Sequence, residues 1–100
     1  MSTFPADLKV LTAQEVRFDD DNLVVALDDG RTIAVPLAWF PRLFHATPAE
    51  RNEWRWIGRG IGIHWPELDE DVSVEGLVLG RPSGEGPESL RRWLAGREQA

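Results

Sequence analysis

Between Glu15 and Val35 the chain alternates apolar stretches with two short turn sequences, and this pattern constrains the fold more than any other feature. Apolar and polar residues alternate over 15–19, and Ile33 and Val35 alternate with the smaller Thr32 and Ala34, as is typical of strands with one buried face. The turns read Asp-Asp-Asn and Asp-Asp-Gly, and the continuous apolar run Leu23–Leu27 lies between them. We therefore expect a three-stranded antiparallel meander whose middle strand is covered on both faces.

A second strand pair is expected further along the chain. Residues 55–57 and 61–65 flank a Gly-Arg-Gly turn. Strand alternation would place Ile61, Ile63 and Trp65 on one shared face. If the Trp65 ring is fully buried, its removal should cost about 3 to 5 kcal/mol of folding free energy.

Two short helices carry recognisable start signals. Thr47-Pro48-Ala49-Glu50 has the spacing of a capping box, in which the Thr47 hydroxyl accepts from the Glu50 N–H and the Glu50 carboxylate accepts from the Thr47 N–H. This helix is expected to run to about residue 53 or 54. Ser73 is predicted to cap a second helix that stops at Gly80.

The end of the chain is expected to separate into a linker and a helix. Residues 81–87 are rich in glycine and proline, which predicts a flexible linker. The predicted helix covers 88–100, and Leu90, Trp93 and Leu94 fall on one face of it at i, i+3 and i+4. Because an isolated helix of about eleven residues is marginal in water, this face must pack on something. The chain's own sheet and a groove on another chain both remain open as its partner.

Together these elements predict an α+β fold. We expect a small, mostly antiparallel sheet built from two hairpin units, with short helices and a C-terminal helix. A chain of 100 residues has room for one compact domain, which we place at residues 1–80.

The charge balance excludes several classes of function. Seventeen acidic residues against eleven basic ones give a net charge of -6, which disfavours nucleic-acid binding by the chain alone. The absence of cysteine excludes disulfides and thiolate metal sites and agrees with a reducing compartment. The first residues have neither a basic leader nor an apolar run, and no segment resembles a membrane span. We expect a cytoplasmic protein without membrane contact.

An acidic segment follows the second hairpin. It places Glu67, Asp69, Glu70, Asp71 and Glu75 close together without an intervening base. The segment lacks the alternating oxygen ligands and central glycine of an EF-hand. We interpret it as a solvated acidic surface, or as a patch for an arginine-rich partner, with part of its charge favouring the start of the next helix.

No other constellation supports an enzyme. His45 and His64 are too few for a zinc site, which needs three or four converging ligands. The glycines at 58–62 fit a hairpin turn better than a phosphate loop, because Pro66 arrives before a helix could form. The serines lack a nucleophile elbow. We therefore expect no catalytic residue, no cofactor and no metal.

Three segments of the chain resemble one known family. They are Trp39-Phe40-Pro41-Arg42-Leu43 followed by Ala46, Gly62-Ile63-His64-Trp65-Pro66-Glu67-Leu68-Asp69-Glu70-Asp71, and Val74-Glu75-Gly76-Leu77. On these residues the chain is similar, over roughly 7–80, to the bacterial domain-of-unknown-function family 2442. The resemblance implies a small α+β domain without defined catalytic residues. Some members carry a helix-turn-helix, and some are predicted from gene neighbourhood to be antitoxins beside small toxin-like proteins. A single helix after residue 87 departs from the helix-turn-helix members, which argues against direct promoter binding.

These observations favour a non-enzymatic protein-interaction module, most concretely an antitoxin-like protein that neutralises a small basic partner encoded nearby. One alternative is a transcription-regulatory dimer that acts with its partner. Another is an enzyme that uses the acidic segment 67–71 with His64. The candidate partner-binding residues are Leu90, Trp93, Leu94, Glu67, Asp69, Glu70 and Asp71.

Overall fold

The first three strands form one antiparallel sheet, as the turn pattern predicts. The computed structural model describes residues 10–99. In it, β1 (Ala13–Phe18), β2 (Asn22–Leu27) and β3 (Thr32–Pro36) pair in the order β1-β2-β3. Four β2 residues facing both sides of the sheet are at most 5% exposed, which confirms its central position.

The second hairpin is present, and a third strand extends it. β4 (Arg55–Ile57), β5 (Gly62–Trp65) and β6 (Glu70–Ser73) form a separate antiparallel sheet in the order β4-β5-β6. Ile63 and Trp65 are both fully buried on β5. The prediction for Ile61 was wrong: it precedes β5 and is 47% exposed, because the chain is still turning there.

Strand β6 corrects the interpretation of the acidic segment as wholly solvated. Its side chains alternate, so that Glu70 and Val72 are buried while Asp71 and Ser73 are exposed. This is the period of a strand with one face on the core. The segment was misread because its carboxylates suggested solvent, whereas pairing with β5 directs one of them inward.

Short helices connect the strands. They are the 3-10 turn η1 (Leu37–Trp39), α2 (Pro41–Phe44), α3 (Pro48–Arg51), α4 (Val74–Val78) and the longer α5 (Pro87–Gln99). Both predicted start signals are confirmed: Thr47 and Glu50 form the reciprocal capping box, and Ser73 accepts from the Gly76 N–H. Helix α3 ends two or three residues earlier than the sequence suggested, because the chain turns into β4.

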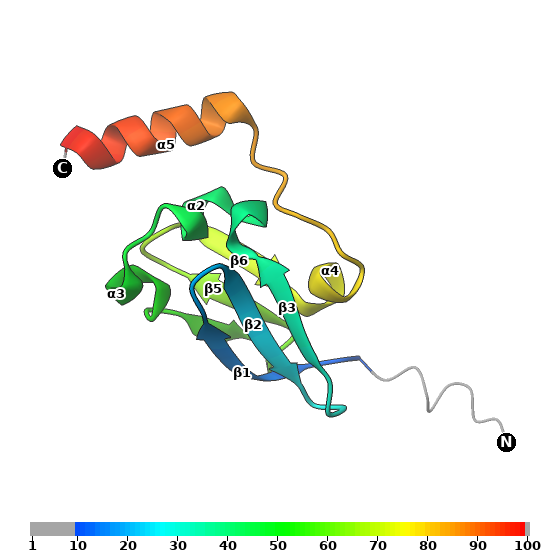
Figure 1. Ribbon diagram of the computed structural model, residues 1–100. Coiled ribbons are helices and arrows are strands. Elements are labelled where there is room, and N and C mark those ends of the chain that lie inside the picture. The colour runs from blue at the N-terminus through cyan, green and yellow to red at the C-terminus, as the bar shows by residue number, and fades with distance from the viewer. Residues whose placement is uncertain (1–9, 100) are drawn as a thin grey trace, which may run out of the picture.

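The two sheets pack on one another and share a core. Figure 1 shows the β1-β2-β3 sheet in front of the β4-β5-β6 sheet, with α2 and α4 beside them and α5 beyond α2. The largest fully buried side chains come from both sheets and from the segments around them: Trp65, Leu23, Leu27, Leu43, Ile63, Leu68, Val25 and Val74.

The Gly60 turn holds the sheets together and permits a sharp test. The Ala13 N–H donates to the Gly60 carbonyl at 2.8 Å, and a Cβ on Gly60 would lie 2.6 Å from the Ala13 carbonyl oxygen. Gly30 also has a positive φ, but a Cβ there meets nothing within 4 Å. Because only the first substitution adds a backbone clash, we expect Gly60→Ala to lower the unfolding free energy by about 2 kcal/mol and Gly30→Ala by about 1 kcal/mol. Urea denaturation measures both, and equal losses would contradict the contact.

Candidate functional site

Helix α5 carries the apolar residues that the sequence singled out. It begins with Pro87 at its first position, where the missing N–H is not needed, and the Leu90 N–H donates to the Gly86 carbonyl at 3.1 Å. Leu90, Trp93 and Leu94 are all half-buried. Trp93 packs against the hydrophobic core, so part of the helix does contact its own domain.

Arg42 on α2 connects the domain to the segment before α5. Its guanidinium donates to Glu85 through Nε at 2.8 Å and through Nη2 at 2.9 Å, while Nη1 donates to the Leu68 carbonyl at 3.0 Å. The side chains of Arg42 and Glu85 are only 16% and 7% exposed. Hydrogen bonds from Arg42 lower the pKa of Glu85, and the same bonds raise the pKa of Arg42. This is a bidentate, partly buried pair, the stronger kind of protein ion pair.

A second bidentate pair holds the far end of the helix. Arg97 donates from Nη1 and Nη2 to the Glu50 carboxylate at 3.0 and 2.9 Å. Glu50 is also the capping-box residue that accepts from the Thr47 N–H. Hydrogen bonding to Arg97, followed by the bond from Thr47, lowers the pKa of Glu50 to about 2. A capping signal in the sequence therefore also marks a tertiary contact.

Trp93 lies between these two pairs. The Arg42 guanidinium carbon is 5.2 Å from the centre of the indole, and that of Arg97 is 4.6 Å from it. Both distances are typical of cation–π contacts. We call Arg42–Glu85, Arg97–Glu50 and the stacked Trp93 the α5 anchor. The anchor is largely polar, and it leaves Leu90 and Leu94 only partly covered.

The segment predicted as a linker makes its own contacts with the domain. The Ser83 N–H donates to the Trp39 carbonyl at 2.9 Å, and the Ser83 hydroxyl accepts from the Glu85 N–H at 3.1 Å. Glu85 in turn accepts from the Ser89 hydroxyl at 2.6 Å. These bonds lead the chain from the domain into the first turn of α5.

The structure divides the acidic candidates by exposure. Glu67, Asp69 and Asp71 are exposed. Asp69 has a φ of 50°, which is the left-handed conformation that Asp tolerates better than most residues. Asp71 contacts Nδ1 of His64 at 2.5 Å across the β5–β6 pair. These three residues are available to a partner at one edge of the second sheet.

Glu70 differs from its neighbours because only 9% of it is exposed. Burial raises the pKa of its carboxyl to about 7, and the nearby Glu85 carboxylate adds to the effect while Arg42 opposes it. Glu70 also lines a cavity of about 220 Å³ together with Arg81 and Ser83. It is therefore a buried group beside the α5 anchor, and the expectation that it belongs to an exposed patch was wrong.

Sequence reasoning missed the four charged residues of the α5 anchor. Arg42 and Glu85 are 43 positions apart, and Glu50 and Arg97 are 47 apart, so no local pattern could pair them. The Thr47–Glu50 spacing was the only available signal, and it identified Glu50 as a cap alone. Within the described part of the chain, no three His, Asp or Glu side chains gather as metal ligands, and no helix is long and apolar enough to cross a membrane.

The fold and this site define a small α+β domain that carries an appended, ion-paired helix. The chain belongs to the DUF2442 family of proteins of unknown function, whose model matches residues 13–83. That match includes both sheets and stops before α5.

Two solved structures share the fold. A protein of unknown function from Rhodospirillum rubrum is 29% identical, with a TM-score of 0.66, over 77% of this chain and 95% of that one. An uncharacterised protein from Chromobacterium violaceum is 25% identical, with a TM-score of 0.63, over 86% of this chain and 75% of that one. No curated protein matches.

Proposed function

We propose that the protein is a non-enzymatic interaction module that binds a small basic protein through α5 and the exposed acidic residues. The observation that carries the proposal is the way α5 is attached. Two arginine–carboxylate pairs and a stacked indole hold the helix, while Leu90 and Leu94 stay partly exposed. Leu90 and Leu94 are covered only in part, so a partner that buries their remaining apolar surface gains free energy at α5.

The division of the chain supports the same assignment. The family region ends at residue 83 and contains the sheets and their core, while α5 lies beyond it. The buried residues of the core all lie within 13–77, and of α5 only Trp93 packs against them. The helix is free to serve recognition, in the way that an amphipathic helix fills a partner's groove.

Charge supports a basic partner. The chain has a net charge of -6, and Glu67, Asp69 and Asp71 are exposed on one segment. Complementary charge accelerates association and discriminates among partners. Together with the predicted antitoxin role of some family members, this favours neutralisation, in the cytoplasm, of a small toxin-like protein encoded next to this one.

The proposal is tested by capturing the product of the adjacent gene. A Leu90→Ser, Leu94→Ser double variant should bind it at least tenfold more weakly than the unchanged chain, because both apolar contacts are lost. The matched control is Ala95→Ser with Arg92→Ser, which alters exposed residues elsewhere on the same helix. Isothermal titration calorimetry measures the affinities. Equal affinity for the leucine variant and the control would remove α5 from the binding site.

A further inference from the structure

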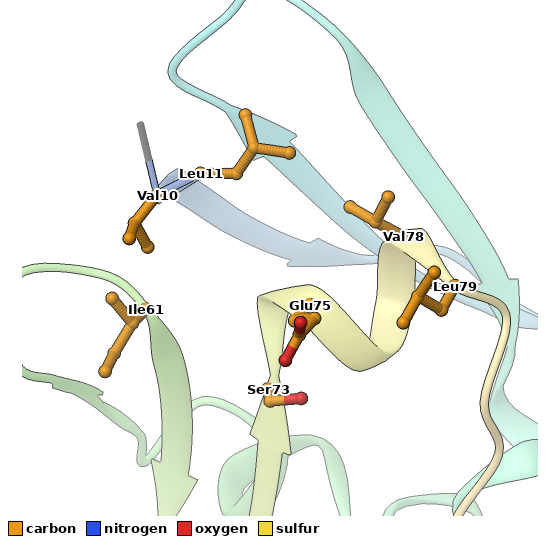
Figure 2. Close-up of a pocket in the computed structure, with 7 residues that line it drawn as sticks. All are labelled: Val10, Leu11, Ile61, Ser73, Glu75, Val78 and Leu79. Atoms are coloured by element: carbon orange, nitrogen blue, oxygen red, sulfur yellow. The ribbon is translucent and has the colours of Figure 1, made fainter. Parts of the chain in front are cut away.

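Two hollows in the surface share Ser73 but differ in the chemistry of their linings. Figure 2 shows the larger, of about 520 Å³, whose lining is mostly aliphatic. The smaller, of about 220 Å³, is formed by β6, α4 and the segment 81–84 that leads toward α5. Its lining includes charges of both signs, from Glu70 and Arg81, and the hydroxyl-bearing residues Ser73 and Ser83. We call this smaller hollow the charged cavity.

The Glu70 carboxyl is the buried charge of the charged cavity. Only 9% of the residue is exposed, and within residues 10–99 no N–H or O–H donates a hydrogen bond to it. Arg42, which attracts Glu70 electrostatically, donates its hydrogen bonds to Glu85 and to the Leu68 carbonyl instead. Buried polar groups almost always have a hydrogen-bond partner, so this carboxyl is left to a group that enters the cavity.

Arg81 supplies the opposite charge on the same cavity. The residue is exposed, and its guanidinium makes no ion pair or side-chain hydrogen bond with any other residue that the structure describes. An ion pair requires a nitrogen and an oxygen within about 4 Å of each other. Glu70 and Arg81 therefore face one cavity without meeting.

The two serine hydroxyls add hydrogen-bond donors to the lining. The Ser73 and Ser83 hydroxyls each accept from a backbone N–H, at 2.9 and 3.1 Å. Each hydroxyl therefore keeps its own hydrogen to donate. Together with Arg81 these donors suit a carboxylate, whereas the ionised Glu70 is an acceptor that suits an ammonium group.

A ligand with a single charge fits this lining less well than one with both charges. A cation that meets Glu70 also faces Arg81, and an anion that meets Arg81 also faces Glu70. Asp71 lines the cavity too, but its carboxylate contacts His64. Over the described range, no group of three metal-ligating side chains is present. The volume is below the roughly 300 to 1,000 Å³ of pockets for drug-sized ligands, so the ligand is small.

We infer that the charged cavity binds a small zwitterion, an amino acid whose ammonium group meets Glu70 and whose carboxylate meets Arg81 and the two serine hydroxyls. The bound amino acid joins β6 to the segment that leads into α5. The inference goes beyond the proposed function and does not depend on it, because Leu90 and Leu94 take no part in this site.

Titration of the full chain with three amino acids, followed by NMR, tests the site. Glycine, β-alanine and γ-aminobutyrate carry the same two charges at increasing separation. The amide signals of Gly76 and Gly84, which line the cavity, report binding. At pH 8 we expect at least one amino acid to bind at least tenfold more tightly than methylammonium and acetate, which carry one charge each. Absence of binding, or equal affinity for the amino acids and the single-charge probes, would overturn the inference.

Two charge-removing variants test which residues hold the ligand. Glu70→Gln and Arg81→Gln should each weaken binding of the amino acid at least tenfold, because each removes one of the two opposite charges. The matched controls are Glu15→Gln and Arg59→Gln, which change exposed residues outside the cavity and should bind as the unchanged chain does. If either cavity variant bound as tightly as its control, the assignment of the two charges would be wrong.

The Glu70 carboxyl also reports on the ligand directly. Saturation with the amino acid should lower the pKa of Glu70, because a nearby ammonium group favours the ionised carboxyl. Arg42, Glu85, Asp69 and Asp71 act on Glu70 with and without ligand, so the comparison isolates the charge of the ligand. Carbon-13 NMR follows the titration. An unchanged pKa at saturation would place the amino acid elsewhere.

A direct ion pair between Arg81 and Glu70 is the competing arrangement, in which Arg81 closes over the cavity. In that case Arg81→Gln would increase the proton affinity of Glu70 at least tenfold, because it removes the adjacent cation. We expect a smaller change, since the two charges face each other across the cavity without contact. A tenfold increase, measured by the same carbon-13 titration without ligand, would overturn the inference.

Discussion

Replacing Trp65 with alanine is expected to lower the free energy of unfolding by about 3 to 5 kcal/mol, the largest effect of any single substitution considered for this protein. The side chain is fully buried between the sheets. Its ring meets the edge of Phe18 at a centroid distance of 6.3 Å, and its Nε1 donates to the Arg51 carbonyl at 3.0 Å. The substitution removes the apolar contacts, leaves a cavity and deprives the carbonyl of its donor, and all three changes act in the same direction.

Chemical denaturation followed by far-UV circular dichroism measures this loss without depending on the deleted fluorophore. Trp65→Phe gives an intermediate case, because it keeps one buried aromatic ring and removes the indole N–H together with the second ring; we expect a cost of about 1 to 3 kcal/mol. Trp54→Ala serves as the control, since Trp54 is only partly buried and contacts Trp56 at the margin of the core. A loss of unfolding free energy below about 1 kcal/mol for Trp65→Ala would mean that the Trp65 ring contributes little to the packing of the core.

The burial of Trp65 illustrates which parts of the fold a sequence reveals. Three features depend only on residues that are close in the chain: period-two apolar alternation, hairpin turns and side-chain caps. Each was predicted from a few neighbouring residues. The three-stranded meander, the Thr47–Glu50 box and the Ser73 cap are all confirmed. The division of the strands into two sheets depends on tertiary packing, which the local pattern does not contain.

Strand β6 shows where charge misleads. Glu70-Asp71-Val72-Ser73 alternates inward and outward like any edge strand, but it has only one apolar residue. Carboxylates are rarely buried without a partner, so the composition of this segment predicted that its side chains are exposed to solvent. Pairing with β5 decided the orientation instead, and the register with Trp65 directs Glu70 to the interior.

The candidate site was predictable only in part. The apolar residues of α5 follow from helical spacing, but the contacts that position the helix join residues more than 40 positions apart. Arg42 was visible in the sequence as an ordinary arginine after a proline. Its role follows from the geometry that brings Glu85, the Leu68 carbonyl and Trp93 around one guanidinium.

The burial of Glu70 beside Arg42 and Glu85 makes the stability of the fold depend on pH in an unusual way. Burial raises the pKa of its carboxyl from 4.5 to about 7. The folded protein therefore binds this proton more tightly than the unfolded chain does, and stability falls as the pH rises from about 4.5 to about 7. Above that range the carboxyl is ionised in both states, and the loss is constant. A shift of this size corresponds to about 3 kcal/mol.

Glu70→Gln isolates this effect because the amide keeps the shape of the side chain and does not titrate. The difference in unfolding free energy between the variant and the unchanged protein should move by about 3 kcal/mol in favour of the variant between pH 4.5 and pH 8. Urea denaturation at a series of pH values measures it. Comparing the two proteins at each pH cancels the contributions of all groups that both proteins contain.

Glu67→Gln supplies the matched control, since Glu67 belongs to the same segment but is exposed. Because Glu67→Gln leaves the Glu70 carboxyl in place, it should not reproduce the gain of about 3 kcal/mol expected for Glu70→Gln. The charged groups that face Glu70 are Arg42 on α2, Glu85 before α5, and its neighbours Asp69 and Asp71. Ionised Glu70 repels Glu85 within the α5 anchor, so the pH change should also loosen α5. The difference in fluorescence between the unchanged protein and Trp93→Phe isolates the signal of Trp93, and it should change over the same pH range. The prediction would be contradicted if the difference in unfolding free energy between Glu70→Gln and the unchanged protein did not change with pH. The Glu70 carboxyl would then be ionised in the folded protein at pH 5, because attraction to Arg42 outweighs the cost of burial.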